Sequence, residues 1–140
     1  MQTPVLERLL VRAGLRPTRK RLHLARLLFD GPDQHVTAED LMQAVQESGH
    51  AVSLATVYNT LNQFSAAGLL RRISLDGTKT FFDTNTADHH HIYHEDEDKL
   101  VDVAGGRIQI NGLPRLAKGD KVKSVEVMIR VNSEGEFNKN

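Results

Sequence analysis

The sequence contains no cysteine in its 140 residues. This absence excludes a disulfide framework, a thiolate zinc knuckle and a cysteine nucleophile. Long hydrophobic runs are absent as well, and none approaches the roughly 20 apolar residues that a transmembrane helix needs. The segment after Met1 is amphipathic and charged, unlike a signal peptide. We therefore expect a cytoplasmic protein with no membrane partner, made of one domain or two small ones.

The sequence also has no excess of either charge, since 18 basic and 18 acidic residues balance. The two signs are nevertheless separated along the chain. Residues 8–29 hold seven basic side chains and no acid, whereas residues 95–98 read E-D-E-D. A basic segment of this kind indicates a polyanionic partner. The alternative interpretation is an ordinary solvated helix face.

Four segments of the first half have apolar residues at helical spacing, which predicts three or four short helices. Each segment is bounded by a capping residue, a glycine or both. At residues 37–40 the pattern T-A-E-D resembles a capping box with Asp in place of Glu. The start signals are Thr18, Thr37 and Ser53, and the stop signals are Gly14, Gly31-Pro32, Gly49 and Gly68.

The period changes after Gly68. Residues 69–75 and 78–83 predict two strands around a tight turn at Asp76-Gly77. Short helices followed by a hairpin are the element order of a winged helix-turn-helix. Further strands are expected at residues 89–94, 99–103, 107–110 and 122–131, and Pro114 argues against a long helix among them.

The last of these helices, beginning at Ser53, has the sharpest pattern. The face opposite its buried stripe is polar and contains no acid. Asn and Gln side chains can pair with adenine there, and Tyr58 can lie against a thymine methyl group. The helix therefore predicts DNA recognition in a major groove, with an ordinary surface helix as the alternative. The residues of this face are Ala55, Tyr58, Asn59, Asn62 and Gln63.

Four of the seven histidines lie in the run D-H-H-H-I-Y-H that begins at Asp88. Dense histidine suits a transition metal, haem iron or titration near neutral pH better than it suits packing. Side chains alternate along a strand, so His89 and His91 share one face, and His90 and His94 share the other. The spacing lets His89 and His91 reach one ion. The run therefore predicts two sites, or one site and a spare face.

Several motifs carry a resemblance to a known family. They are L-R-P-T-R-K-R from Leu15, H-V-T-A-E-D-L from His35 and S-L-A-T-V-Y from Ser53. On these motifs the chain resembles the ferric uptake regulator (Fur) superfamily in register, from about residue 10 to residue 131. T-F-F-D-T-N from Thr80 and D-H-H-H from Asp88 make it most similar to the iron response regulator (Irr) branch.

The resemblance implies an α+β fold with an N-terminal winged helix-turn-helix over residues 1–84. A linker at residues 85–87 would lead to a small α/β dimerisation domain at residues 88–140, which senses metal or haem. The implied protein is a dimeric DNA-binding transcription regulator, mainly a repressor, of iron and haem homeostasis. It is not an enzyme.

The resemblance also implies roles at the DNA. Tyr58 would read a base, Arg12 would reach a minor groove, and Arg21 would hold the phosphate backbone. Asn59 stands where Fur proteins usually have an arginine, which suggests a different and A·T-rich operator. The full set of expected DNA-binding residues is Arg12, Arg19, Arg21, Ser53, Ala55, Thr56, Tyr58 and Asn59.

The family pattern supplies metal ligands for the first histidine face. A mixed set of nitrogen and oxygen donors suits zinc, manganese or ferrous iron better than calcium or a soft metal. Such a site would join the two domains and couple metal binding to DNA binding. The implied ligands are His35, Asp83, His89, His91 and Asp102.

Three features depart from the family pattern. The Cys-X-X-Cys zinc pairs are missing, with His94 and Glu97 in the region of the first pair. A second metal site is lost where the chain has Gln109 and Val125. The cysteine–proline haem motif of some Irr proteins is absent, which leaves a cysteine-independent haem site with His90 as axial ligand and His94 as the weaker candidate.

Other functions stay open at this stage. A Fur-like repressor corepressed by iron, manganese or zinc would use the metal face without haem. A small metalloenzyme would use His89, His91 and a carboxylate as an open triad, although no motif supplies a general base. A haem or metal carrier would leave the helix that begins at Ser53 without a purpose.

Overall fold

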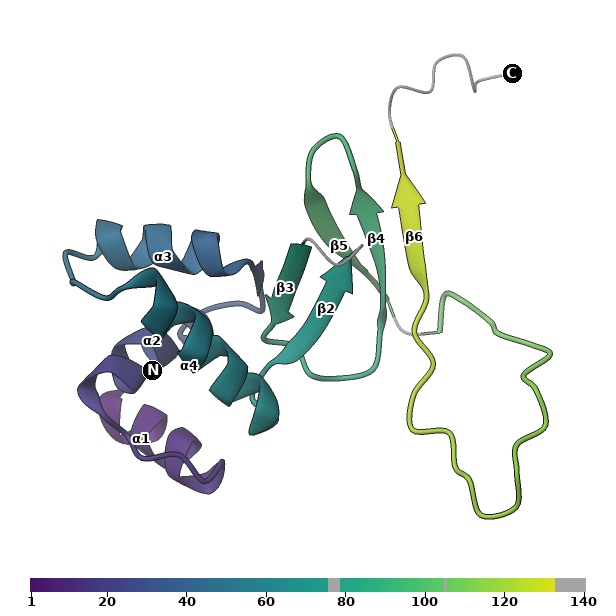
Figure 1. The fold of residues 1–140 in the computed structure, drawn as a ribbon, viewed down its shortest axis with the longest axis horizontal. Helices are drawn as coiled ribbons and strands as arrows, with labels where there is room; N and C mark the ends of the chain where they lie inside the picture. The colour runs from purple at the N-terminus through teal and green to yellow at the C-terminus, as the bar shows by residue number, and fades with distance from the viewer. Residues whose placement is uncertain (76–78, 105, 133–140) are drawn as a thin grey trace. The chain divides into compact units, whose positions relative to one another are not determined.

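The computed structural model describes residues 1–75, 79–104 and 106–132 (Figure 1). The chain divides into two compact units, Met1–Thr86 and Ala87–Asn140. We call these unit 1 and unit 2. Helices and a small sheet make up unit 1, and a second small sheet makes up unit 2, so the predicted α+β fold class is confirmed.

Unit 1 begins with helices whose ends match the capping signals of the sequence. The Thr18 hydroxyl accepts a hydrogen bond from the Arg21 amide, and the Ser53 hydroxyl accepts one from the Thr56 amide. Thr37 and Asp40 form a reciprocal capping box, in which each side chain accepts from the other's backbone amide. The helices are α1 (Thr3–Arg12), α2 (Arg19–Phe29), α3 (Ala38–Glu47) and α4 (Leu54–Ala66).

The apolar stripes of the four helices close around one core in unit 1. Phe64 from α4 and Phe82 from the sheet are the largest fully buried side chains in the described parts of the chain. Leu24, Leu41 and Leu61 from three different helices join the same cluster. This packing leaves the polar face of α4 exposed, which is the face expected to contact DNA.

A three-stranded antiparallel sheet completes unit 1. Its strands are β1 (His35–Val36), β2 (Arg71–Leu75) and β3 (Lys79–Asp83), in the order β1-β3-β2. Strands β2 and β3 pair from Arg71 opposite Asp83 to Leu75 opposite Lys79, as a hairpin requires. The turn predicted at Asp76-Gly77 lies outside the described residues. The helices and this hairpin together form the expected winged helix-turn-helix.

Unit 2 contains a second three-stranded sheet. Its strands are β4 (His90–His94), β5 (Lys99–Val103) and β6 (Met128–Val131), in the order β5-β4-β6. β5 is antiparallel to β4, and β6 is parallel to it. Within residues 87–104 and 106–132, unit 2 forms strands and turns and no helix.

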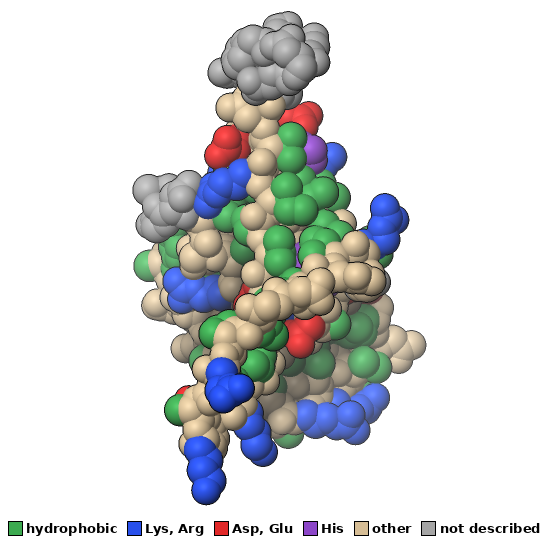
Figure 2. All heavy atoms as spheres, turned by 90° about the vertical axis from the view of Figure 1, so that its right-hand side faces the viewer, with side chains coloured by type: hydrophobic (Ala, Val, Ile, Leu, Met, Phe, Trp, Pro, Cys, Tyr) green, Lys and Arg blue, Asp and Glu red, His purple; other side chains and the backbone are tan. Residues whose placement is uncertain are grey.

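The long connection between β5 and β6 corrects two strand predictions. Residues 107–110 form no strand, and the strand expected at residues 122–131 extends only over Met128–Val131. Gly106, Gly112 and Gly119 have φ angles of 85°, 77° and 94°, which interrupt an extended chain. A segment with alternating apolar residues forms a strand only where a neighbouring strand pairs with it. This segment is almost entirely exposed. Figure 2, in which the segment faces the viewer, shows Lys and Arg side chains along its outer end.

None of the helices in the described part of the chain is both long and apolar enough to cross a membrane.

Candidate metal centre and DNA-binding surface

Two of the expected metal ligands face each other in unit 1. His35 on β1 and Asp83 at the end of β3 are cross-strand partners. Their side chains approach to 3.3 Å between Nε2 and Oδ2. Asp83 is fully buried, and its other carboxylate oxygen accepts a hydrogen bond from the Asn85 amide at 2.9 Å. Because a buried carboxylate needs a compensating charge or donor, this pair is a built arrangement and not a surface contact.

The other three expected ligands meet in unit 2. His91 on β4 lies opposite Asp102 on β5 in the strand register, and His89 stands immediately before β4. One oxygen of Asp102 lies 3.0 Å from Nε2 of His89 and 3.3 Å from Nε2 of His91. Both imidazoles are buried. The predicted alternation therefore holds, with both rings directed at one carboxylate.

The hydrogen bonds of His89 identify the atoms that are available to a metal. Its Nδ1 lies 2.6 Å from the carbonyl oxygen of Ala87, and a carbonyl only accepts, so Nδ1 carries the proton. In the neutral ring, Nε2 then presents a lone pair to the Asp102 carboxylate. Two lone pairs in this position repel unless a proton or a metal cation lies between them. Metal-binding histidines commonly donate their second ring N–H to a carbonyl in this way.

The chemistry of the donors fits a borderline divalent ion. Unit 1 offers one imidazole and one carboxylate, and unit 2 offers two imidazoles and one carboxylate. Within each unit the ligand atoms lie within 4.8 Å of one another, which is close enough for a shared ion. Nitrogen and oxygen donors of this kind suit zinc, manganese or ferrous iron.

The second histidine face has different surroundings. His90 is half-buried, and its Nδ1 accepts a hydrogen bond from the Val127 amide at 3.0 Å. His94 lies four residues further along the same strand, opposite Lys99. At about 3.3 Å per residue, the two histidines are roughly 13 Å apart along the strand. They are therefore too far apart to ligate one haem iron from its two sides.

Helix α4 presents the expected DNA-reading residues on its exposed side. Ser53 caps the helix, and its hydroxyl donates to the Thr56 hydroxyl at 3.0 Å. Ala55, Tyr58 and Asn59 are exposed. A capped helix start with small and polar residues on one face has the shape and chemistry needed to enter a major groove.

The basic residues that precede α4 separate into two groups. Arg21 contacts α4 directly, since its guanidinium donates to the Gln63 side chain at 3.1 Å and to the Arg16 carbonyl at 2.9 Å. Arg12 ends α1 and Arg19 begins α2, and both are exposed. Arg21 is thus fixed beside the recognition helix. A groove of about 390 Å³ here is lined by Arg16, Thr18, Lys20, Arg21, Thr56, Asn59, Thr60 and Gln63.

Two contacts of this surface were not anticipated from the sequence. Tyr58 donates its hydroxyl proton to Glu39 of α3 at 3.0 Å, and Arg72 of β2 donates to Asn62 of α4 at 3.1 Å. Both contacts join residues of different elements, so helical periodicity carried no signal for them. The two consecutive arginines at the start of β2 were a signal for a polar or polyanionic contact, and they did not indicate which helix lies beside the strand.

Comparison with protein families matches residues 12–130 to the ferric uptake regulator family. The chain belongs to the ferric uptake regulator family. The regulator of Shigella flexneri is 37% identical over 101 residues, which cover 71% of this chain and 68% of that protein. The regulator of Legionella pneumophila is 38% identical over 97 residues, which cover 69% and 66%.

Solved structures of Fur proteins have the same fold. The regulator of Pseudomonas aeruginosa, solved with manganese, superposes with a TM-score of 0.70 at 27% identity and covers 94% of this chain and 98% of its own. The Vibrio cholerae regulator has a TM-score of 0.72 at 24% identity, with coverage of 90% and 98%. Fur proteins are dimeric DNA-binding transcription regulators, so operator DNA and a second copy of the chain are its partners. They are not enzymes, which removes the metalloenzyme alternative.

Proposed function

We propose that this chain is a metal-responsive repressor in which one divalent ion is bound by ligands of both units. The observation that carries the proposal is the position of the Asp102 carboxylate. One of its two oxygens faces Nε2 of both buried histidines, His89 and His91. The proposed ligands are His35, Asp83, His89, His91 and Asp102.

Coordination numbers support a site that draws on both units. Zinc takes four ligands, and manganese and ferrous iron generally take more. The described residues of unit 1 supply two of the proposed ligands, and those of unit 2 supply three. A closed site therefore requires both sets. The bound ion would contribute the positive charge that the buried carboxylate of Asp83 needs.

A site of this kind gives metal binding a route to DNA binding. His35 and Asp83 belong to the sheet of the winged helix, and the other proposed ligands belong to unit 2. Joint ligation holds the DNA-binding unit in one orientation and so favours one member of an existing set of arrangements. If metal raises the affinity for operator DNA, operator DNA raises the affinity for metal by the same factor, because the coupling is reciprocal.

The proposed DNA contacts divide by chemistry. Arginines bind the phosphate backbone or the minor groove, and side chains of α4 read base edges. Asn59 suits adenine through paired hydrogen bonds, which supports an A·T-rich operator. The residues assigned to these contacts are Arg12, Arg19, Arg21, Ser53, Ala55, Thr56, Tyr58 and Asn59.

Haem is the second candidate effector, as the likeness to the iron response regulator branch implies. The half-buried ring of His90, on the strand face away from the metal ligands, favours it. The hydrogen bond from the Val127 amide to Nδ1 of His90 weighs against it, because the proton of the neutral ring then lies on Nε2. Haem ligation through Nε2 would require that proton to leave. The donor geometry therefore supports a divalent metal more strongly.

The test compares His35→Ala, Asp102→Asn and the control Glu97→Gln, an exposed acid in the turn after β4. Elemental analysis of each purified protein and anisotropy titrations of operator DNA, with and without Mn²⁺, give the two readouts. We expect the first two variants to lose bound metal and a metal enhancement of DNA affinity of about ten-fold or more. Full metal binding by His35→Ala would contradict a site shared by both units.

Haem is tested separately by absorption titration of the wild type and His90→Ala. We expect no Soret shift that depends on His90 and no effect of haem on operator affinity. A His90-dependent haem spectrum, together with loss of DNA binding on haem addition, would establish the second candidate instead.

A further inference from the structure

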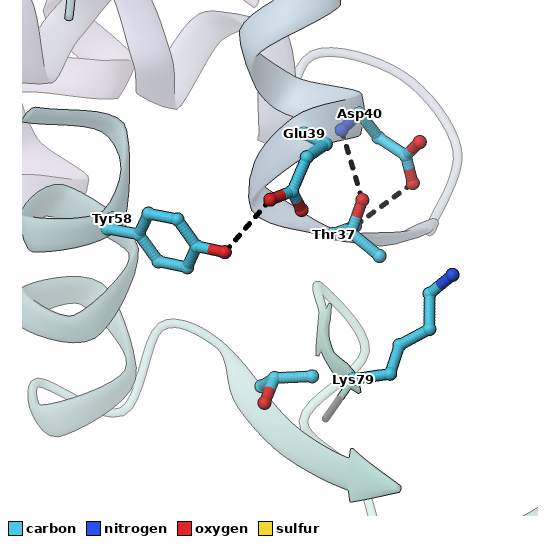
Figure 3. A pocket seen from close by; sticks show the side chains of 6 residues that line it. Thr37, Glu39, Asp40, Tyr58 and Lys79 are labelled. Carbon is cyan, nitrogen blue, oxygen red and sulfur yellow. Dashed lines mark hydrogen bonds between the residues drawn. The ribbon is translucent and has the colours of Figure 1, made fainter. Parts of the chain in front are cut away.

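A polar pocket lies between three elements of unit 1 (Figure 3). Its walls come from the first turn of α3, the exposed side of α4 and the start of β3. The pocket has a volume of about 450 Å³ and opens beside the recognition helix. The lining residues are Thr37, Glu39, Asp40, Tyr58, Lys79 and Thr80.

The hydroxyl of Tyr58 points across this pocket to Glu39 (Figure 3). A carboxylate only accepts hydrogen bonds, so the 3.0 Å contact fixes the hydroxyl proton on the Glu39 side. The same bond raises the pKa of Tyr58 above its ordinary value, because Glu39 stabilises the protonated phenol. Towards solvent, and towards any base, the Tyr58 oxygen then presents only lone pairs.

The two acids at the start of α3 have different structural roles. Asp40 accepts from the Thr37 amide at 3.0 Å and closes the capping box. Glu39 takes no part in the cap and extends to Tyr58 instead. Glu39 is exposed and next to the expected DNA path, where a negative charge opposes phosphate. As an acid in the first turn of α3, Glu39 also complements the helix dipole, but that effect does not direct its side chain, whereas the bond with Tyr58 does.

We propose that Glu39 is a positioning residue that sets which bases Tyr58 accepts. With its proton held by Glu39, the Tyr58 hydroxyl accepts from the amino group of adenine or cytosine, and its ring can lie against a thymine methyl group. Guanine offers only acceptors, N7 and O6, at its own major-groove edge, so it is disfavoured at the contacted position. This inference rests on the proposed contact of Tyr58 with DNA.

The test uses duplexes that the Mn²⁺-loaded wild-type protein selects from a random-sequence pool. Each operator position is then changed to guanine, and the affinity ratio of the selected duplex to the guanine duplex is measured. Glu39→Ala frees the hydroxyl proton, so we expect this ratio to fall about five-fold at the position that Tyr58 contacts, on the scale of one hydrogen bond. Glu39→Gln should keep most of the discrimination, since its amide oxygen can accept the same proton.

A double-mutant cycle with Tyr58→Phe separates positioning from a general charge effect. If Glu39 acts through the hydroxyl, Glu39→Ala will not change the guanine ratio in the Tyr58→Phe background. Glu47→Gln is the matched control, because it removes one exposed acid from the other end of α3 and leaves the Tyr58 contact intact. We expect it to leave the guanine ratio unchanged.

The outcomes distinguish this inference from the function on which it rests. An unchanged guanine ratio in Glu39→Ala overturns the inference, and so does an equal change in the Tyr58→Phe background. Loss of discrimination by Glu39→Gln as complete as that by Glu39→Ala would assign the effect to charge and also overturn it. Failure of the wild type to select any duplex, or an operator affinity unaffected by Tyr58→Ala, contradicts the proposed DNA contact itself.

Discussion

The two units differ sharply in how much apolar surface they bury. In the described parts of the chain, seventeen buried hydrophobic residues lie in unit 1, whereas unit 2 has only Leu100. Unit 1 encloses its core with four helices and a sheet. Unit 2 has three short strands and a long exposed connection that carries Leu113, Leu116 and Val122 at its surface.

This difference indicates that the units are stabilised by different means. Burial of apolar side chains contributes about 1.5–3 kcal/mol for each large residue, so unit 1 has an ample internal source of stability. The described residues of unit 2 offer little of that source. We therefore expect unit 2 to draw stability from ligand binding and from association with a second copy, both of which act through mass action. On this expectation unit 1 is stable by itself, and the stability of unit 2 depends on its ligands and its partner.

The largest expected effect tests the core of unit 1. Phe64→Ala removes a fully buried ring and should lower the free energy of unfolding by about 3–5 kcal/mol. Tyrosine fluorescence can show which unit loses stability, because the chain has no tryptophan and has one tyrosine in each unit, Tyr58 and Tyr93. In the Tyr93→Phe background, the remaining signal reports on unit 1. A melting temperature unchanged by Phe64→Ala would contradict the assignment of this core.

The next effect tests the dependence of unit 2 on metal. Ion at a hundred-fold excess over its dissociation constant should stabilise the bound form by about 2.7 kcal/mol. Melting curves in the Tyr58→Phe background, with Mn²⁺ or with a chelator, measure this shift through Tyr93. Asp102→Asn is expected to abolish the shift, and Glu97→Gln is expected to retain it. Equal shifts in all three proteins would contradict ligation by Asp102.

A smaller effect concerns the capping box at the start of α3. Thr37→Ala removes the hydroxyl that accepts from the Asp40 amide, and should lower the stability of unit 1 by about 1 kcal/mol. Thr37→Ser is the matched control, since it keeps the accepting oxygen. Chemical denaturation followed through Tyr58 measures both variants. Equal losses in the two would assign the effect to the buried methyl group instead.

The smallest effect is a pH dependence within unit 1. Burial of the His23 ring, and secondarily the charge of His50, lower the pKa of His23. The neutral ring is therefore the form that the fold prefers. This contribution is complete above the ordinary histidine value of about 6.5 and is lost as the pH falls from there through the lowered pKa.

His23→Gln should flatten this part of the stability profile. Denaturation at about pH 8 and about pH 5, on either side of the ordinary value, measures the change. Lys20→Gln, on the same helix, is the control for loss of a positive charge. A profile as steep in His23→Gln as in the wild type would show that another group is responsible.

Local sequence signals predicted much of the fold because their physical causes are local. Thr18, Thr37 and Ser53 cap helices through backbone amides three residues away, so the caps were predictable from the sequence. The order of helices and hairpin predicted the winged helix, whereas the family resemblance supplied the proposed metal ligands only as a set. Alternation along a strand predicted that His89 and His91 would face one side.

What the sequence did not predict depends on contacts between distant elements. The Tyr58–Glu39 bond joins residues 19 positions apart on different helices. The strand expected at residues 107–110 had an alternating pattern, and yet no neighbouring strand accepts its hydrogen bonds within the described residues. Periodicity describes which side chains share a face. It does not specify which face another element will cover.

Strand β3 directly connects two functional regions of the winged helix. Lys79 and Thr80 at its start line the Tyr58 pocket, and Asp83 at its end pairs with His35. At about 3.3 Å per residue, the strand spans roughly 13 Å between Lys79 in the pocket wall and Asp83, the proposed ligand. A displacement of Asp83 along the strand axis would reach the pocket wall without passing through any loop. One strand of five residues therefore connects the proposed metal ligand to the pocket of Tyr58.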